Sequence, residues 1–405
     1  MRKPRLLMMS DSPEIDSGNG RVTREVLKHL QKDFEIVSVI GWNSLGQLHS
    51  FPYHIQPVHY FVRESKEMKY IFIDAVNKSK PDVILVHGDI WNFEYFPDLK
   101  MPGIKKVGYI TVDVHPLRPK WNPIWESFDA VATPSFWGKK EIEDATPVKA
   151  EVIYEGVDPD IFKPLSQEEI EKKRENMRVL CKAKGLTIPK FFVTMFARPM
   201  ERKNLPAGIR ALAKVVQKHA DIGHIILYPL KEIDEGSHNM EEYNRRYLPE
   251  KMAKLLYRDV GPRGHLKDEE IAKVLSCSDV LLFPTCQEGF GLPVLEAMAC
   301  GCVPIATDST SMPELLGDNE RGLLAKAGAV TVYPASLFEC KLVDENDLAE
   351  KLDLLYSDPG MLHKLKTAGI SWAHQHTWGK TAACLKDIIL RTLDQREKPV
   401  VLDEI

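Results

Sequence analysis

The chain has 405 residues, of which 28% are charged, and a formal net charge of −4 at pH 7. This mild acidity excludes a protein that holds nucleic acid mainly through bulk positive charge, although a local basic groove stays compatible with it. The length exceeds what one ordinary hydrophobic core needs, so two domains are expected. The seven cysteines lack metal-ligand spacing and are expected to be buried thiols in a reducing compartment.

The first half of the chain alternates short apolar runs with longer amphipathic segments. Such alternation is typical of parallel strands joined by helices that cover both faces of a sheet. Helices are predicted over residues 21–31 and 69–80. The predicted strands are residues 5–10, 34–41, 81–88, 106–112, 129–135 and 149–156.

The N-terminus carries basic and apolar residues, but Asp11 and Glu14 follow at once. This pattern predicts a first strand and its loop and not a signal peptide. No apolar stretch approaches the length that spans a bilayer, so no integral membrane segment is expected. The predicted location is the cytoplasm, with a peripheral position at a membrane as one possibility.

A glycine-containing turn follows the first predicted strand. Gly18, Asn19 and Gly20 precede a helix that is expected to open with Arg21. A turn of this kind presents backbone N–H groups and the positive end of the helix dipole, which suits a phosphate. The pattern is not GxGxxG, however, and an ordinary strand–helix turn would look the same. Both interpretations stay open from the residues alone.

Residues 155–185 interrupt the alternation, because they are punctuated by proline, then highly charged, and lack a strand signal. They are the predicted domain boundary. Asp158 and Asp160 lie in this segment and are interpreted as structural and not as metal ligands. The predicted division is an N-terminal domain over residues 1–165, a C-terminal domain over residues 166–380, and a last helix over residues 381–405 that packs back on the N-terminal domain.

A second series of strands and helices follows the boundary and predicts a second doubly wound domain. Residues 231–259 are longer and more polar than a strand–helix connection needs, and predict a surface insertion, a lid or an exposed helix pair. The predicted strands of this half are residues 191–197, 224–230, 279–285, 303–307 and 322–326.

Basic residues follow the first strand of this second series. Arg198 and Lys203, with Arg202 beside them, lie between that strand and a helix. Because ligands of doubly wound sheets bind at the carboxyl ends of the strands, these cations can neutralise a diphosphate there. The alternative is a solvated run of surface charge.

A second candidate site follows the strand over residues 279–285. There Glu288 leads into Gly289, Phe290 and Gly291, where the backbone can approach a ligand closely. The helix that begins next carries Glu296, and the two carboxylates can accept hydrogen bonds from sugar or ribose hydroxyls. The alternative is a helix N-terminus with two acidic residues near its positive end.

Residues 288–307, followed by PELL at 313–316 and RGLLA at 321–325, strongly resemble the retaining glycosyltransferases of family GT4, whose fold is GT-B. The E-x7-E pair of that family falls on Glu288 and Glu296, and its basic pair falls on Arg198 and Lys203. Further likeness lies in the boundary segment 155–164, in the glycine turn 17–21 and in the closing helix 377–390.

The resemblance implies an α/β chain with two tandem doubly wound, Rossmann-like domains that face each other across a cleft. It implies metal-independent transfer of a hexose, with retention, from a UDP- or GDP-linked nucleotide diphosphate sugar to an acceptor hydroxyl, with no further cofactor. In this assignment Arg198 and Lys203 stabilise the leaving diphosphate, and Glu296 holds the ribose. The remaining contacts with the donor are assigned to Glu288, Gly289, Phe290, Gly291 and Leu292 in one domain and to Gly18, Asn19 and Gly20 in the other.

The sequence departs from the family pattern at one candidate position. Many members carry a histidine after the strand that here covers residues 106–112, whereas this chain has Asp113 at about that place and His115 two positions on. Either residue could line the site.

The acceptor and the class of reaction both stay open from the sequence. The acceptor could be a glycan, a lipid-linked sugar, a small molecule or a modified nucleic acid. A nucleotide-sugar epimerase and a non-catalytic sugar-nucleotide binder of the same fold are the alternatives to a transferase. A dinucleotide-dependent oxidoreductase would need GxGxxG after the first strand, and that motif is absent.

Overall fold

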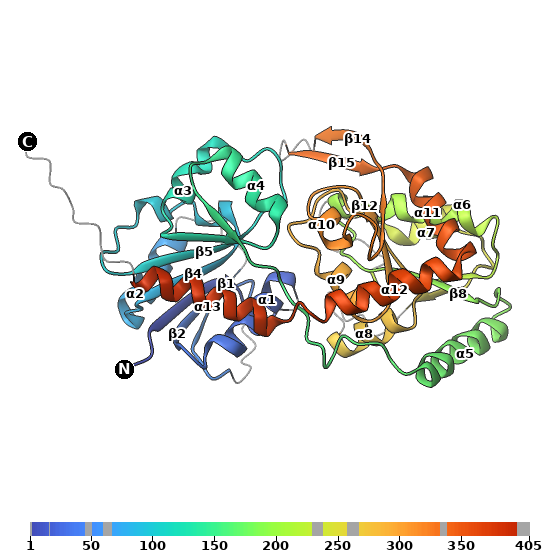
Figure 1. Cartoon of the computed structure of the whole chain (residues 1–405), viewed down its shortest axis with the longest axis horizontal. Coiled ribbons are helices and arrows are strands. Elements are labelled where there is room, and N and C mark those ends of the chain that lie inside the picture. Colours follow the sequence, from blue (N-terminus) through green and yellow to red (C-terminus); the bar gives the residue numbers. More distant parts are fainter. Residues whose placement is uncertain are drawn as a thin grey trace, which may run out of the picture. The chain divides into compact units, whose positions relative to one another are not determined.

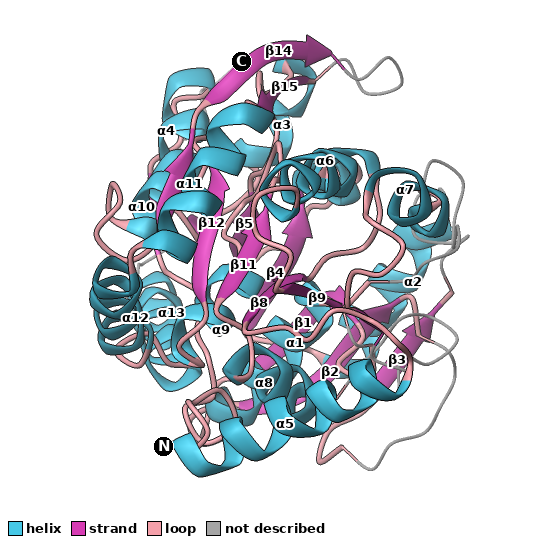
Figure 2. Cartoon of the chain, turned by 90° about the vertical axis from the view of Figure 1, so that its right-hand side faces the viewer, coloured by secondary structure: helices cyan, strands magenta, loops and turns pink. Residues whose placement is uncertain are grey.

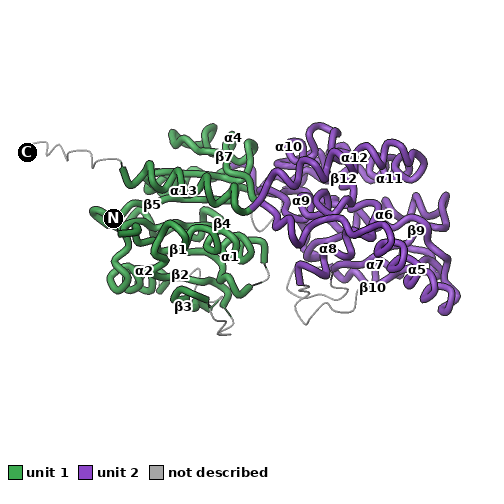
Figure 3. Tube along the Cα trace, turned by 60° about the horizontal axis from the view of Figure 1, so that its bottom comes forward, with its two compact units in different colours: residues 1–112, 117–155, 378–405 green, residues 113–116, 156–377 purple. Residues whose placement is uncertain are grey.

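A computed structural model describes residues 2–15, 17–44, 51–59, 67–228, 238–256, 267–332 and 338–394. The chain divides into two compact units (Figure 3). The first unit comprises residues 1–112, 117–155 and 378–405, and the second comprises residues 113–116 and 156–377.

The first unit is built on a parallel sheet whose described strands run in the order β3-β2-β1-β4-β5-β6-β7 (Figure 1). The apolar runs of the sequence correspond to every one of these strands except β3, which is short, contains Pro57 and lies at the sheet edge. The strand order reverses between β1 and β4, as in doubly wound folds. The strands are β1 (Arg5–Asp11), β2 (Glu35–Trp42), β3 (Ile55–Val58), β4 (Val83–Asp89), β5 (Lys105–Thr111), β6 (Ala130–Thr133) and β7 (Ala150–Val152).

Helices cover this sheet (Figure 2). The last helix of the chain packs against the first helix and against β5. Two hydrogen bonds fix it there: Lys386 Nζ donates to Asp33 Oδ1 at 2.6 Å, and Thr381 Oγ1 donates to the Tyr154 carbonyl at 2.8 Å. The α-helices of the unit are α1 (Gly18–Leu30), α2 (Glu67–Ser79), α3 (Asn122–Glu126), α4 (Phe136–Ala145) and α13 (Trp378–Asp394). Residues 395–405 of the predicted last helix lie outside the described residues.

The main segment of the second unit begins at Gly156, ahead of the boundary expected between residues 165 and 166. The intervening residues group with the second unit because they are hydrogen-bonded to it. The Val157 N–H donates to the His376 carbonyl at 3.0 Å, and the Leu165 N–H donates to Ser276 Oγ at 3.4 Å. Asp158 braces a turn of this segment, since its Oδ1 accepts the Asp160 N–H at 3.0 Å.

A second parallel sheet, with described strands in the order β10-β9-β8-β11-β12-β13, forms the centre of this unit. The expectation of two tandem doubly wound domains is therefore confirmed. An antiparallel pair, β14 and β15, stands apart from the parallel sheet and was not predicted, nor was β10. The strands are β8 (Phe191–Met195), β9 (Ile222–Ile226), β10 (Lys254–Leu256), β11 (Val280–Phe283), β12 (Val303–Thr307), β13 (Leu323–Ala325), β14 (Ala327–Val332) and β15 (Glu339–Val343).

One hydrophobic core of this unit lies between the sheet and the helices α6 and α11. Val193, Leu282 and Ile305, from three neighbouring strands, are fully buried in it. The α-helices are α5 (Gln167–Ala183), α6 (Leu205–Val216), α7 (Met240–Tyr247), α8 (Asp268–Ser276), α9 (Leu292–Ala299), α10 (Met312–Leu316), α11 (Glu345–Ser357) and α12 (Pro359–Ala373). Of the segment 231–259, residues 238–256 form α7 and β10, and the others lie outside the described residues.

Two expectations about the whole chain can be compared with the structure. All cysteines are free thiols, and all are buried except Cys384 on α13, so the expectation of burial is wrong for that residue. Among the described helices, none is both long and apolar enough to cross a membrane.

Candidate functional site

The loop after β8 brings two cations to the carboxyl end of the second sheet. Residues Glu201–Lys203 form a single 3₁₀ turn, and Asn204 ends it in the left-handed conformation, with φ of 49°, before α6 begins. This turn places Arg202 and Lys203 next to the loop that follows β11. The two loops are tied together, since the Cys286 N–H donates to the Arg202 carbonyl at 2.8 Å.

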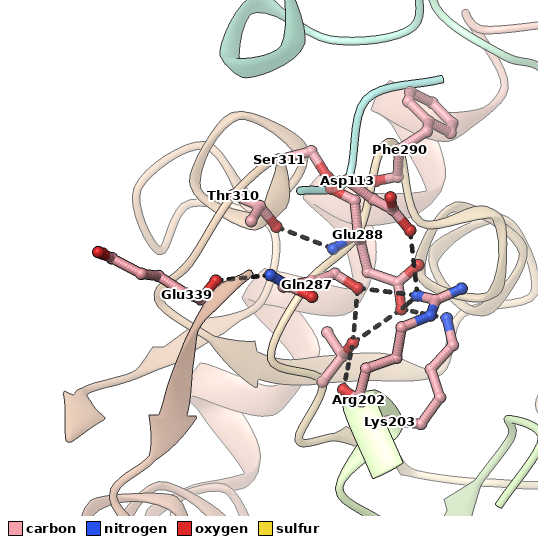
Figure 4. A network of polar contacts seen from close by, with 10 residues as sticks. Asp113, Arg202, Lys203, Gln287, Glu288, Phe290, Thr310, Ser311 and Glu339 are labelled. Atoms are coloured by element: carbon pink, nitrogen blue, oxygen red, sulfur yellow. Dashed lines mark hydrogen bonds and ion pairs between the residues drawn. The ribbon is translucent and has the colours of Figure 1, made fainter. Parts of the chain in front are cut away.

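The loop that follows β11 is held by side chains that bond its backbone carbonyls (Figure 4). Arg202 Nη1 donates to the Gln287 carbonyl at 3.0 Å. Ser311 Oγ lies 3.0 Å from the Glu288 carbonyl and 2.9 Å from that of Phe290. The loop ends at Gly291, whose φ of 106° favours glycine, and Met312 Cε would lie 2.6 Å from a Cβ there. The path of this loop is therefore strongly determined by its surroundings.

A cluster of opposite charges surrounds Glu288 on this loop (Figure 4). The ammonium group of Lys203 forms an ion pair with the Glu288 carboxylate, which also accepts a hydrogen bond from Thr285 Oγ1 at 2.8 Å. Arg202 Nη1 lies 3.9 Å from Glu288 Oε1 and 3.6 Å from Asp113 Oδ2. The Glu288 side chain is buried and that of Lys203 nearly so, so this pair is shielded from solvent.

The electrostatics of the cluster favour an ionised Glu288 carboxylate and disfavour the charged form of Lys203. Burial lowers the pKa of Lys203, and the neighbouring charge of Arg202 lowers it further. Burial alone would raise the pKa of Glu288, but Lys203 and Arg202 outweigh that effect, and the pKa is lowered. Glu288 is thus held as an acceptor-only carboxylate, and the cations next to it favour a further anion.

The glycines of this loop leave hydrogen-bond donors for such an anion. Within the described part of the chain, the N–H groups of Gly289 and Gly291 donate to no acceptor. Gly291 is the N-cap of α9, with Pro293 in the first turn, so the positive end of the helix dipole lies here. The remaining predicted residues of the loop and helix are buried, with exposed fractions of 2% for Phe290, 7% for Leu292 and 1% for Glu296.

The sequence left open whether Asp113 or His115 belongs to the site, and the structure brings only the Asp113 side chain into the charged cluster of Figure 4. His115 is exposed, and its carbonyl accepts the Glu339 N–H at 2.7 Å. Both residues group with the second unit. Gln287 Nε2 donates to the Glu339 carbonyl at 2.6 Å. Glu339, at the start of β15, is therefore hydrogen-bonded both to His115 and to the loop that follows β11.

The two residues of the basic pair predicted from the sequence lie in different surroundings. Lys203 lies in the cluster, whereas Arg198 is exposed nearer the end of β8. The arginine that contacts the carboxylates is Arg202, which the sequence analysis named only as a neighbour. The pattern of the sequence could not distinguish them, because the 3₁₀ turn decides which side chain points to Glu288.

The glycine turn of the first unit differs from its prediction. The helix α1 begins at Gly18 and not at Arg21, so Gly18, Asn19 and Gly20 form its first turn. Ser17 caps it by accepting the Gly20 N–H at 3.0 Å and donating to Asp11 at 2.8 Å. A Cβ at Gly20 would lie 2.3 Å from the Ile15 carbonyl oxygen, so close packing alone accounts for this glycine.

Among the residues placed by the structure, no three His, Cys, Asp or Glu side chains are arranged to hold a metal ion.

Solved structures with a similar arrangement of strands and helices define the fold. A glycosyltransferase of Rickettsia africae is 17% identical, with a TM-score of 0.71 over 98% of this chain and 100% of that one. Anabaena Alr3699/HepE, solved in complex with UDP and glucose, is 15% identical, with a TM-score of 0.69 over 96% of this chain and 100% of that one. At these identities the likeness concerns the fold, which is the GT-B fold of glycosyltransferases.

Sequence comparison narrows the class to a family. Residues 182–372, a little under half of the chain, match the family described as glycosyl transferases group 1. The resemblance to GT4 is thereby confirmed over these residues. A D-inositol 3-phosphate glycosyltransferase of Streptomyces bingchenggensis is 25% identical over 250 residues, which cover 60% of this chain and 48% of that protein. The chain spans less than half the length of this relative and of two curated mannosyltransferases that it also matches.

Proposed function

We propose that this protein is a retaining glycosyltransferase that moves a hexose from a UDP- or GDP-linked nucleotide diphosphate sugar to an acceptor hydroxyl, without a metal ion. The observation that carries the proposal is the buried Lys203–Glu288 ion pair, with Arg202 beside it, on a glycine loop at the start of α9. The match of residues 182–372 to the group 1 family supports it.

In this proposal the donor diphosphate is bound by cations and backbone donors. Lys203, Arg202 and the N–H groups of Gly289 and Gly291 neutralise the phosphates, and the predicted role of Arg198 is the same. As the bond between the anomeric carbon and the phosphate oxygen breaks, negative charge grows on the leaving diphosphate. Preorganised cations stabilise that charge more than they stabilise the bound donor, so they lower the barrier.

The carboxylates recognise the sugar and the ribose in the proposed complex. Glu288, kept ionised by its neighbours, accepts hydrogen bonds from donor-sugar hydroxyls, and Glu296 accepts them from the ribose. The anomeric carbon forms its new bond with the acceptor oxygen on the face that the diphosphate leaves, and the acceptor proton passes to the departing phosphate. No protein base is then required.

A panel of UDP- and GDP-hexoses, each tested with glycan, lipid-linked, small-molecule and nucleic-acid acceptors, examines the proposal. Release of nucleoside diphosphate should require an acceptor and should persist in excess chelator, and NMR of the product should show a retained anomeric configuration. Donor isomerisation without acceptor would instead show an epimerase. Binding of a nucleotide sugar without turnover on any acceptor would indicate a non-catalytic binder.

A further inference from the structure

Three consecutive hydroxyl side chains, Ser309, Thr310 and Ser311, bond the loop that carries Glu288. They come from the short connection between β12 and α10. Ser309 Oγ donates to the Cys286 carbonyl at 3.0 Å, and Ser311 Oγ lies 3.0 Å from the Glu288 carbonyl. Thr310 acts in the opposite sense, because its Oγ1 accepts the Glu288 N–H at 3.1 Å (Figure 4). The connection thus bonds the peptide groups on both sides of the Glu288 α-carbon.

This arrangement depends on an unfavourable backbone conformation at Thr310. Successive side chains of an extended chain point to opposite sides, so three in a row reach the same loop only if the chain turns between them. Thr310 provides the turn with φ of 51°. A β-branched residue is a genuine outlier in this left-handed region, where glycine is the default. Strain of this kind persists where the surroundings over-determine it, and it clusters at functional sites.

The local fold does not by itself require a hydroxyl at this position. Ser311 is the N-cap of α10 and makes no side-chain capping bond, so the helix start does not use these hydroxyls. Asp318, in the turn after α10, has nearly the same φ of 50° and is exposed. Aspartate tolerates this region better than threonine does, so the strain at Thr310 is the greater, and it coincides with a bond to Glu288.

We propose that Thr310 is a positioning residue for the donor sugar, acting through Glu288. The Glu288 carboxylate is fixed by Lys203 and Thr285, its carbonyl by Ser311, and its N–H by Thr310. Loss of the last bond frees one end of the residue and lets the carboxylate leave the position in which it meets the sugar. This inference rests on the proposed function, in which Glu288 contacts the donor.

Three variants separate positioning from backbone strain. Thr310→Gly removes the hydroxyl and relieves the strain, so its melting temperature should stay within about 2–4 °C of the parent or rise, while kcat/KM for the donor falls roughly tenfold. Thr310→Val keeps the branched shape and should lose both stability and activity. Thr310→Ser keeps the acceptor and should retain activity within about twofold. Asp318→Gly, the control, introduces glycine at an exposed position with nearly the same φ and should leave kcat/KM unchanged.

Amide hydrogen exchange at Glu288 provides a readout that does not depend on turnover. Exchange should accelerate in Thr310→Gly and Thr310→Val and match the parent in Thr310→Ser. Parental kcat/KM in Thr310→Gly, or unchanged exchange at Glu288, would overturn the inference. A parent that binds no nucleotide sugar would refute the proposed function instead, and the exchange data would still decide whether Thr310 positions Glu288.

Discussion

Two glycine-containing segments that lead into helices can be compared: residues 17–20 at α1 and residues 286–291 at α9. In the first, Ser17 accepts the Gly20 N–H, and the Ile15 carbonyl leaves no room for a Cβ at Gly20. The Gly18 N–H donates to no acceptor within the described residues. In the second, side chains bond the carbonyls of the loop, and two glycine N–H groups stay available within the described chain.

Because both segments leave a glycine N–H without an acceptor, a glycine before a helix is weak evidence of a ligand site until the side chains beside it are known. The segment at α1 uses its polar groups to build the helix start. At α9, side chains of neighbouring segments hold the backbone, and Arg202 and Lys203 lie beside Glu288. We therefore expect substitutions in the second segment to change catalysis and those in the first to change mainly stability.

The largest expected effect follows removal of the buried ammonium group in the second unit. Lys203→Ala should lower kcat about 10²–10³-fold, because it removes a preorganised charge that matters most when the diphosphate leaves. Lys203→Arg should rescue only part of the loss, since a planar fork does not replace a point charge. Steady-state kinetics with a varied donor measure both constants.

Lys218 of the same unit is a suitable control, because it is exposed and pairs with Asp353 at 2.8 Å. Lys218→Ala should keep kcat within about twofold, since exposed ion pairs contribute little. A rise in KM with unchanged kcat in Lys203→Ala would make that residue a uniform binding contact and would remove the main electrostatic element of the mechanism.

The two units also share a feature that makes both sensitive to acid. His87 on β4 and His224 on β9 are fully buried, and burial lowers the pKa of each to about 4 from 6.5. The folded state thus binds fewer protons than the unfolded state between these values, so stability is complete above pH 6.5 and is lost as the pH falls towards 4. Each histidine should withdraw up to about 3 kcal/mol over that window.

Urea unfolding at pH 7 and pH 5 measures this loss. His87→Asn should flatten the pH dependence of the first unit alone, and His224→Asn that of the second, although each also lowers stability at pH 7. An unchanged slope between the two pH values in either variant would assign the acid sensitivity to other groups.

Glu296 provides a smaller effect confined to the second segment. If its carboxylate accepts hydrogen bonds from the ribose, Glu296→Ala should weaken the bare nucleoside diphosphate by about 1.5–3 kcal/mol, which is roughly 10-fold to 150-fold in Kd. Calorimetry measures the affinity directly. Glu320→Ala, at an exposed position after α10, is the control. Equal affinities in the parent and in a folded Glu296→Ala protein would remove the ribose assignment.

The smallest effect compares the two segments directly. Gly20→Ala forces a Cβ against the Ile15 carbonyl oxygen and should cost about 1–3 kcal/mol of stability with little change in nucleotide affinity. Gly291→Ala is strained by its φ of 106° and should lower both quantities. A large loss of nucleotide affinity in a folded Gly20→Ala protein would break the comparison and favour the phosphate contact that the sequence suggested for residues 18–20.

The sequence predicted the parallel strands well, because buried strands of such sheets are continuous apolar runs, as in β4 and β11. It missed β3, which is short and contains Pro57, and the β14–β15 pair, whose first strand is largely exposed. The motif also predicted Glu288 and Lys203 in the site. It could not place Arg202 beside Glu288, or assign Thr310, because those contacts depend on a 3₁₀ turn and on one positive φ.

The central claim is that a donor diphosphate binds at Lys203 and Glu288 without a metal ion. Calorimetric titration of UDP and GDP into the parent and into Lys203→Ala, both in excess chelator, tests it most directly. The account predicts that one nucleotide binds the parent in chelator and binds Lys203→Ala at least tenfold more weakly. Equal affinity in the two proteins, or binding that appears only when Mg²⁺ or Mn²⁺ is added, would contradict it.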